Sequence, residues 1–146
     1  MKSTLAVLAT AVVLALTCTT GLAQDKKQSA KKGAIYVSAD KATYKEIAPG
    51  ISKASLWGDE TKGAYGSYTR FAPGADAGLH THSNDVWIVV LKGAYVYKDD
   101  AGEKRVGPGD FIRIPAKHKH ASGGDKKEGA LFYEESNGKF DLVPAK

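Results

Sequence analysis

The stretch GADAGLHTH, residues 74–82, decides the fold of this chain, because it places two histidines two positions apart just before a strand-like stretch that ends at Gly93. Side chains at positions i and i+2 of an extended segment point to the same side. His80 and His82 can therefore bind one ion, since neutral imidazole is the commonest metal ligand among side chains. A second stretch, GDFIRIP at residues 109–115, leads to the other two of the four histidines. A neighbouring strand can bring His120 onto the same ion, so the sequence predicts a metal site.

The fourth histidine, His118, lies two positions before His120. If this segment is extended, both side chains point to the same side. Three roles for His118 stay open: a fourth metal ligand, a general acid or base at the mouth of the site, or a surface histidine.

The rest of the chain favours an all-β fold. Short apolar segments alternate with turn residues such as Pro49-Gly50 and Asn137-Gly138, and no 3.6-residue periodicity stands out. One short helical turn fits Lys41 to Glu46. This pattern is typical of a single sandwich or small barrel. We expect strands at residues 35–38, 51–57, 64–71, 86–91, 94–98, 110–114, 120–121, 130–134 and 140–143.

One expected strand is apolar on both of its faces. The segment VWIVVL, residues 86–91, shows no polar alternation. Strands of this kind are covered on both sides, here by the barrel interior and by another sheet or subunit. An exposed apolar face on a chain of this size favours a homodimer.

The N-terminus has the features of a secretory signal peptide. Lys2 gives a positive start, residues 5–16 are an almost unbroken apolar run, and Gly21-Leu22-Ala23 supplies small residues at a cleavage site. The apolar run is too short for a permanent membrane span, so we expect no stable membrane insertion. A retained anchor or a lipidated Cys18 is the alternative. We expect residues 1–23 to be removed and the protein to be secreted or periplasmic.

Processing would leave a lysine-rich flexible tail at 24–33 and a β-barrel domain at 34–146. The net charge would fall from +5 to +4, because Lys2 is the only charged residue removed. The mature chain would also lose Cys18, the only cysteine, so no disulfide could form. Export argues against nucleic acid as a partner of the basic tail.

The histidine stretches resemble the two motifs of the cupin superfamily. The first motif has a Gly, five residues, His-x-His, three or four residues, a Glu, six residues and a Gly. Gly74, His80, His82 and Gly93 match it in place. The resemblance implies a single-domain jelly-roll barrel, the double-stranded β-helix, with the matching histidines as metal ligands.

The second cupin motif has a Gly, five residues, Pro-x-Gly, two residues and a His, which Gly109, Pro115 and His120 match. The resemblance covers about residues 45–135. Segments 48–57 and 69–74 also look like the small cupins related to bacterial anti-sigma-factor cupin domains.

The departures from the motifs concern the metal site directly. The glutamate position holds Val86, or Trp87 with the longer spacing, and Lys117 replaces the glycine of the second motif. Asp85 is the nearest carboxylate, and it would need a bulge to reach the ion. Three neutral imidazoles leave a divalent ion its full charge and open positions for water, O₂ or substrate. Some cupins with three histidines and no glutamate are oxygenases.

We therefore predict an exported metal-dependent oxidoreductase that activates O₂ or peroxide. Copper is the favoured metal because it leads the divalent series with nitrogen ligands, and iron(II) or zinc is the alternative. The substrate would be a small molecule or carbohydrate: an extracellular polysaccharide, a small phenol or a diketone. Tyr65, Tyr68 and Trp87 can supply a surface for it, although such residues more often belong to a core or interface.

Two other functions stay open. The anti-sigma resemblance suggests a non-enzymatic domain that binds metal or senses a ligand, and other cupins are sugar isomerases. No glycine-rich phosphate loop and no Gly-x-Ser-x-Gly motif occurs, which argues against nucleotide and serine-hydrolase chemistry.

Overall fold

The described part of the chain is built from β-strands alone. The structure is a computed structural model that describes residues 33–146, so the predicted signal peptide and nearly all of the lysine-rich tail lie outside it. Within this range no helix is long and apolar enough to cross a membrane. The strands are β1 (Lys45–Ala48), β2 (Ile51–Gly58), β3 (Tyr65–Phe71), β4 (Asp76–Thr81), β5 (Val86–Gly93), β6 (Tyr95–Asp99), β7 (Gly102–Val106), β8 (Phe111–Ile114), β9 (His120–Gly124), β10 (Ala130–Ser136) and β11 (Val143–Pro144).

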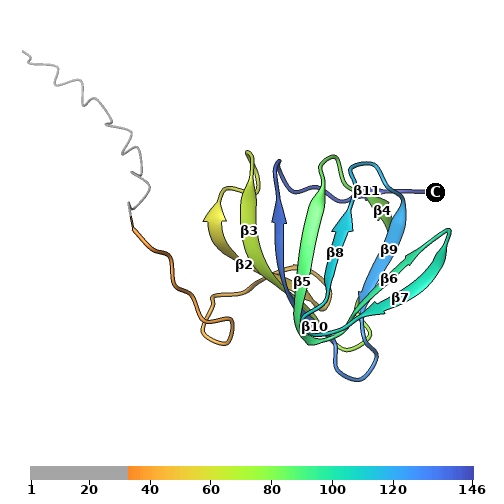
Figure 1. Ribbon diagram of the computed structural model, residues 1–146, viewed down its shortest axis with the longest axis horizontal. Coiled ribbons are helices and arrows are strands. Elements are labelled where there is room, and N and C mark those ends of the chain that lie inside the picture. Colours follow the sequence, from red (N-terminus) through yellow and green to blue (C-terminus); the bar gives the residue numbers. More distant parts are fainter. Residues whose placement is uncertain (1–32) are drawn as a thin grey trace, which may run out of the picture. The chain divides into compact units, whose positions relative to one another are not determined.

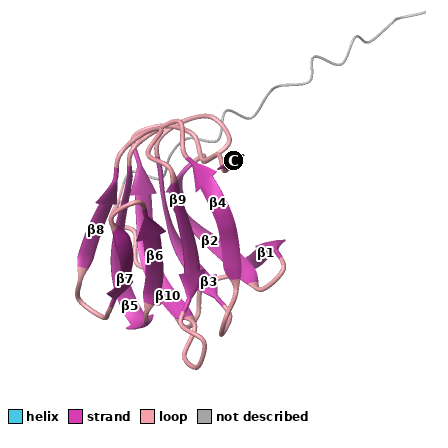
Figure 2. Ribbon diagram, turned by 90° about the vertical axis from the view of Figure 1, so that its right-hand side faces the viewer, coloured by secondary structure: helices cyan, strands magenta, loops and turns pink. Residues whose placement is uncertain are grey.

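The strands form two antiparallel sheets that face each other (Figures 1 and 2). One sheet has the order β1-β2-β3-β10-β5-β8, and the other has the order β11-β4-β9-β6-β7. The chain passes back and forth between the two sheets, so that consecutive strands from β3 to β6 and from β7 to β11 lie in different sheets. These crossings make the jelly roll that the sequence predicts.

The core lies between the sheets and follows the two-residue period of the strands. Alternate side chains of β5 and β10 point inward, and β5 contributes Val86, Ile88 and Val90. Phe71, Tyr95 and Phe132 meet here with ring centroids 5.1–6.1 Å apart. Burial of these large apolar groups is the main force that holds the two sheets together.

The outer face of the larger sheet is partly covered by the chain itself. The Tyr68 hydroxyl and the Arg70 guanidinium donate to the carbonyls of Val37 and Ala39, at 3.2 and 3.0 Å. Leu91, on the same outer face, remains 38% exposed. The second apolar face of residues 86–91 is therefore covered only in part within the described chain.

Several strand predictions need correction. Residues 35–38 form no strand, and β1 occupies the end of the segment for which a helical turn was expected. The strand expected at 140–143 is limited to Val143–Pro144. Three strands were missed, β1, β4 and β7, because their polar and glycine-containing sequences lack a clear two-residue alternation.

Candidate metal centre and cavity

The smaller sheet brings His80, His82 and His120 together. His80 on β4 and His120 on β9 are direct cross-strand partners, and His82 follows immediately after the end of β4. All three are buried, at 1%, 8% and 0% exposure. One ring nitrogen from each lies within 4.8 Å of the other two, so this group could hold a metal ion.

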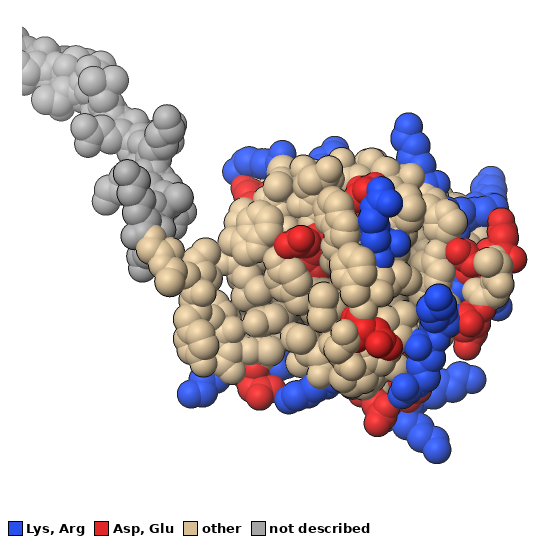
Figure 3. Space-filling model, viewed as in Figure 1, with Lys and Arg blue, Asp and Glu red and all other residues tan. Residues whose placement is uncertain are grey.

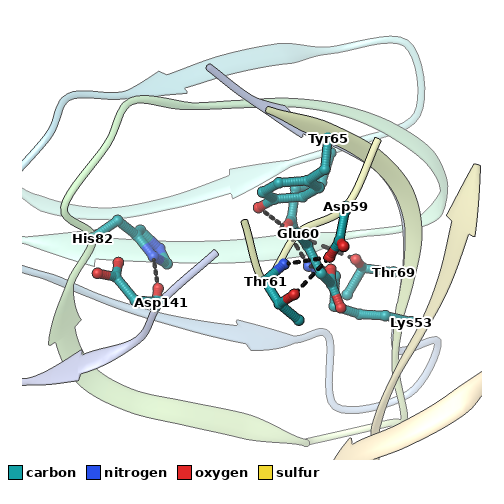
Figure 4. Close-up of polar contacts among 9 residues, drawn as sticks. Lys53, Asp59, Glu60, Thr61, Tyr65, Thr69, His82 and Asp141 are labelled. Atoms are coloured by element: carbon teal, nitrogen blue, oxygen red, sulfur yellow. Dashed lines mark hydrogen bonds and ion pairs between the residues drawn. The ribbon is translucent and has the colours of Figure 1, made fainter. Parts of the chain in front are cut away.

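Backbone carbonyls orient all three imidazoles in the same way. The Nδ1 atoms of His80, His82 and His120 lie 2.8, 2.6 and 3.0 Å from the carbonyl oxygens of Gly78, Asp141 and His118. Figure 4 shows the His82 contact. A carbonyl can only accept, which assigns the proton to Nδ1 and leaves a lone pair on each Nε2. This is the arrangement that metal-binding histidines use.

The residues fit a divalent cation. The Nε2 atom of His120 is buried and has no hydrogen-bond partner among residues 33–146, an unfavourable state for a polar atom that a metal ion would relieve. Burial lowers the pKa of His80 and lowers that of His120 to about 4. Both rings are therefore neutral at neutral pH and available as ligands.

No carboxylate of the described residues belongs to this group. Val86, in the glutamate position, is buried and lines the cavity beside His80 and His82. Asp85 instead accepts hydrogen bonds from the Arg113 side chain and from the Ala116 backbone, at 2.9 and 2.8 Å. The Asp85 carboxylate therefore stabilises the loop after β8 through these hydrogen bonds.

His118 stands apart from the metal group. Its Nε2 atom lies 3.0 Å from Oδ2 of Asp99, the same oxygen that accepts the Tyr97 hydroxyl at 2.7 Å. The Tyr97 ring stacks against His120 at 5.5 Å. His118 contributes to the site through its backbone carbonyl, which orients the His120 ring.

His80 and His82 of the metal group line a cavity of about 440 Å³ between the sheets, which is within the usual range for small-molecule sites. Its walls are mainly apolar. The polar lining residues are Lys53, Thr69, Asp76, His80, His82, Ser122 and Glu134.

Lys53 and Glu134 are two charged members of this lining that the sequence did not single out as site residues. The Lys53 ammonium lies 2.9 Å from Oε1 of Glu134 and 2.9 Å from Oε2 of Glu60. Tyr65 donates its hydroxyl to the same Glu134 oxygen at 2.6 Å, and Thr69 donates to Oε2 at 3.2 Å. Figure 4 shows Lys53, Glu60, Tyr65 and Thr69 gathered at one place in the barrel.

The electrostatics of this cluster keep Glu134 charged. Burial alone would raise the pKa of its carboxyl, but the Lys53 charge and the hydrogen bonds from Lys53 and Tyr65 outweigh burial and lower the pKa. The sequence carried a signal for this pair. Glu134 shares a strand face with Phe132, and Lys53 shares one with Ile51, so each places a charge on an otherwise apolar face.

The three aromatic residues predicted to bind substrate occupy different places. Tyr65 is buried, and its hydroxyl contacts Glu134 of the cavity. Tyr68 lies on the outer face of β3, where its ring packs against Tyr133. Trp87 lies on the face of β5 opposite to Val86, which lines the cavity. Of the three, Tyr65 is the one with a side-chain hydrogen bond to a cavity residue among the described residues.

No curated protein matches this chain, whereas many solved structures share its fold. The polyketide cyclase RemF from Streptomyces resistomycificus matches with a TM-score of 0.62 at 19% identity, over 77% of this chain and 83% of its own. KdgF from Halomonas sp. matches with a TM-score of 0.59 at 19% identity, over 71% of this chain and 94% of its own.

The anti-sigma protein ChrR, solved in complex with SigE of Rhodobacter sphaeroides, gives a TM-score of 0.57 at 18% identity. The match covers 68% of this chain and 51% of that one. At such identities these likenesses show the cupin fold alone. The sequence model of the ChrR cupin-like domain, however, matches residues 32–139, most of the chain. The chain therefore belongs to the ChrR cupin-like family of the cupin superfamily.

Proposed function

We propose that the protein is a metal-dependent oxidoreductase that acts on a small organic molecule in the cavity between its sheets. The observation that carries this proposal is the convergence of three imidazoles, each with Nδ1 bound to a carbonyl, at the wall of that cavity. Three protein ligands with an open side are typical of catalytic rather than structural metal sites.

The donor set favours copper, with iron(II) as the alternative, and zinc would argue against redox chemistry. When bound, the ion would supply a Lewis-acidic, redox-active centre with open positions for O₂ or peroxide and for substrate. The carbonyls of Gly78, Asp141 and His118 hold the three rings in place. The apolar walls of the cavity exclude water from the reacting groups.

Metal analysis and oxygen uptake test this function. We expect protein purified from its native compartment to contain about one equivalent of copper or iron and to consume O₂ with small phenols or diketones. His80→Ala, His82→Ala and His120→Ala should each lower metal affinity by more than about 100-fold, since loss of a ligand costs more than loss of its hydrogen-bond partner. His118→Ala is the matched control and should keep the metal. Stoichiometric zinc without oxygen uptake would contradict the proposal.

A second function is a metal-bearing domain that binds or senses a ligand without turnover. Membership in the ChrR cupin-like family favours it. Under this alternative the metal would be required for ligand binding, but the bound ligand would be recovered unchanged. Product analysis after incubation with metal-loaded protein separates the two functions.

We further propose that the chain is exported, on the sequence of its first 23 residues. Mass spectrometry of protein from the exported fraction should find an N-terminus near Gln24. An intact Met1 in that fraction would contradict cleavage.

A further inference from the structure

Glu134 is a fixed anion on the wall of the cavity that the metal group also lines. Its side chain is 8% exposed, and its carboxylate is not a member of the three-nitrogen group. Glu134, His80 and His82 nevertheless line the same 440 Å³ space. A molecule in this space can therefore contact both the metal group and Glu134.

The two oxygens of Glu134 are occupied unequally. Oε1 accepts from Lys53 at 2.9 Å and from Tyr65 at 2.6 Å. Oε2 accepts only from Thr69, at the longer distance of 3.2 Å. A carboxylate has about four acceptor positions, so Oε2 is the oxygen with room for a further hydrogen bond.

Lys53, by contrast, has no such freedom. Its ammonium is shared between Glu134 and Glu60 and lies 3.7 Å from the centre of the Phe140 ring. It therefore holds Glu134 in its charged form rather than offering a positive charge to a ligand. The polar end of the cavity that Glu134 forms is an acceptor, so it selects a ligand with an O–H or N–H donor.

The other parts of the cavity restrict the ligand further. An ion held by three neutral imidazoles keeps its full positive charge, which favours an anionic oxygen on the ligand. Phe71, Phe132 and Phe140 also line the cavity, and their rings suit an aromatic or other flat apolar body.

We propose, resting on the function proposed above, that the cavity binds a small aromatic anion that also carries a hydroxyl group. The anionic oxygen lies at the metal site formed by His80, His82 and His120. The hydroxyl donates to Oε2 of Glu134, which makes Glu134 the residue that determines specificity.

Three matched probes test the inference without any need for turnover. They are 4-hydroxybenzoate, 4-methoxybenzoate, which has the oxygen but no donor, and benzoate, which has neither. Titrations of the zinc-loaded full chain should show that the hydroxy compound binds about tenfold more tightly than the other two, as one hydrogen bond to a charged acceptor provides. Equal affinities for the three probes, or no binding of any, would overturn the inference.

Glu134→Gln sharpens the test. The amide oxygen would take the place of Oε1, where Lys53 and Tyr65 both donate, so the amide nitrogen would take the place of Oε2. A donor would then face the ligand oxygen, from which both 4-hydroxybenzoate and 4-methoxybenzoate can accept, so the preference for the hydroxy over the methoxy compound should disappear. Zinc affinity should stay within about threefold. Glu135→Gln is the matched control, because Glu135 is next on β10 and accepts from Tyr133.

The outcomes separate the two claims. If the wild-type protein binds zinc but shows no hydroxyl preference, the inference is wrong and the metal site stands. If the wild-type protein binds no divalent metal, the proposed function fails and the inference with it. If Glu134→Gln keeps the preference, the hydroxyl is recognised elsewhere and the inference is wrong. Should this variant not fold, the comparison of the three probes on the wild-type protein still decides.

Discussion

His120 shows why the site suits a cation better than a proton. Its ring is fully buried, its Nδ1 atom is bound to the His118 carbonyl, and its Nε2 atom has no partner. A proton on Nε2 would place an unpaired charge in the interior, which is why burial lowers the pKa to about 4. A metal ion shared with His80 and His82 satisfies the same atom and distributes the charge over three ligands.

At the residue scale, Val86→Glu tests the consequence of the missing carboxylate. Val86 is buried and faces the cavity beside the histidines, so a glutamate there can reach the ion. We expect metal affinity to rise on the order of tenfold, because a fourth, negative ligand joins three neutral ones. The reduction potential and Lewis acidity of the ion should fall, and oxygen uptake should fall with them. Calorimetric metal titration and oxygen uptake provide the two readouts, and Trp87→Glu, on the opposite face of β5, is the control. A rise in turnover would contradict this account.

The three histidines that could hold a metal ion could be predicted from local spacing and from the order of the motifs. His80 and His82 share a face through an i, i+2 relation, and the motif order placed His120 beside them, as the β4–β9 pairing confirms. Lys53 and Glu134 could not be paired in the same way. They lie 81 positions apart in the sequence. They meet because β2 and β10 lie on either side of β3 in the sheet.

At the element scale, β4 is one of the three strands that could not be predicted from the sequence. Its sequence reads as a turn because it contains Gly78, which has a φ of +72°, and its pairing with β9 is irregular between Asp76 and Leu79. Such a segment has no clean alternation, and its strand conformation depends on β9. The sequence therefore showed the ligands of the site more clearly than the strand that carries them.

The turn before β9 contains a residue with a strained backbone conformation, Lys117. Lys117 has a φ of +64°, the left-handed region that favours glycine, and it occupies the position where the second cupin motif has a glycine. Its backbone N–H donates to the His82 carbonyl at 2.7 Å. The conformation of Lys117 is therefore coupled to the segment that carries His82.

Lys117→Gly should therefore stabilise the protein. We expect a gain of about 1 kcal/mol, since glycine adopts this conformation without the steric cost of a side chain. Thermal unfolding should show an increase in Tm of about 4 °C. Lys119→Gly, in the same turn but without a positive φ, should not stabilise. An unchanged or lower Tm for Lys117→Gly would show that the turn carries no such strain.

At the scale of the whole molecule, the outer face of the larger sheet supports the prediction of a homodimer. Trp57, Leu91 and Phe111 remain 38%, 38% and 62% exposed. In the view of Figure 3, most lysine and arginine side chains lie toward the rim, while acidic side chains and a basic one stand among uncharged surface nearer the middle. Sedimentation at increasing concentration should show a dimer, and Phe111→Lys should weaken it. A monomer at high concentration would contradict the prediction.

Stability of the metal-free protein should depend on pH through the buried histidines. The pKa of His120 falls from 6.5 to about 4 on folding because its ring is buried. As the pH drops from about 6.5 toward 4, the unfolded chain gains a proton that the folded protein excludes, so the free energy of unfolding decreases. Urea unfolding of the metal-free protein at a series of pH values should show this loss. His118→Ala should retain it, whereas His120→Ala should reduce it; an equal pH dependence in both variants would contradict the assignment.

The central claim is that one ion binds the Nε2 atoms of His80, His82 and His120. Long-range ¹H–¹⁵N spectra of the imidazoles test it directly, because the chain has four histidines and His118→Ala identifies the fourth. Addition of one equivalent of Zn²⁺ should move the Nε2 resonances of all three into the metal-bound range while each Nδ1 keeps its proton. If any of these three rings binds through Nδ1, or keeps a proton on Nε2 when zinc is bound, the account of the site is wrong.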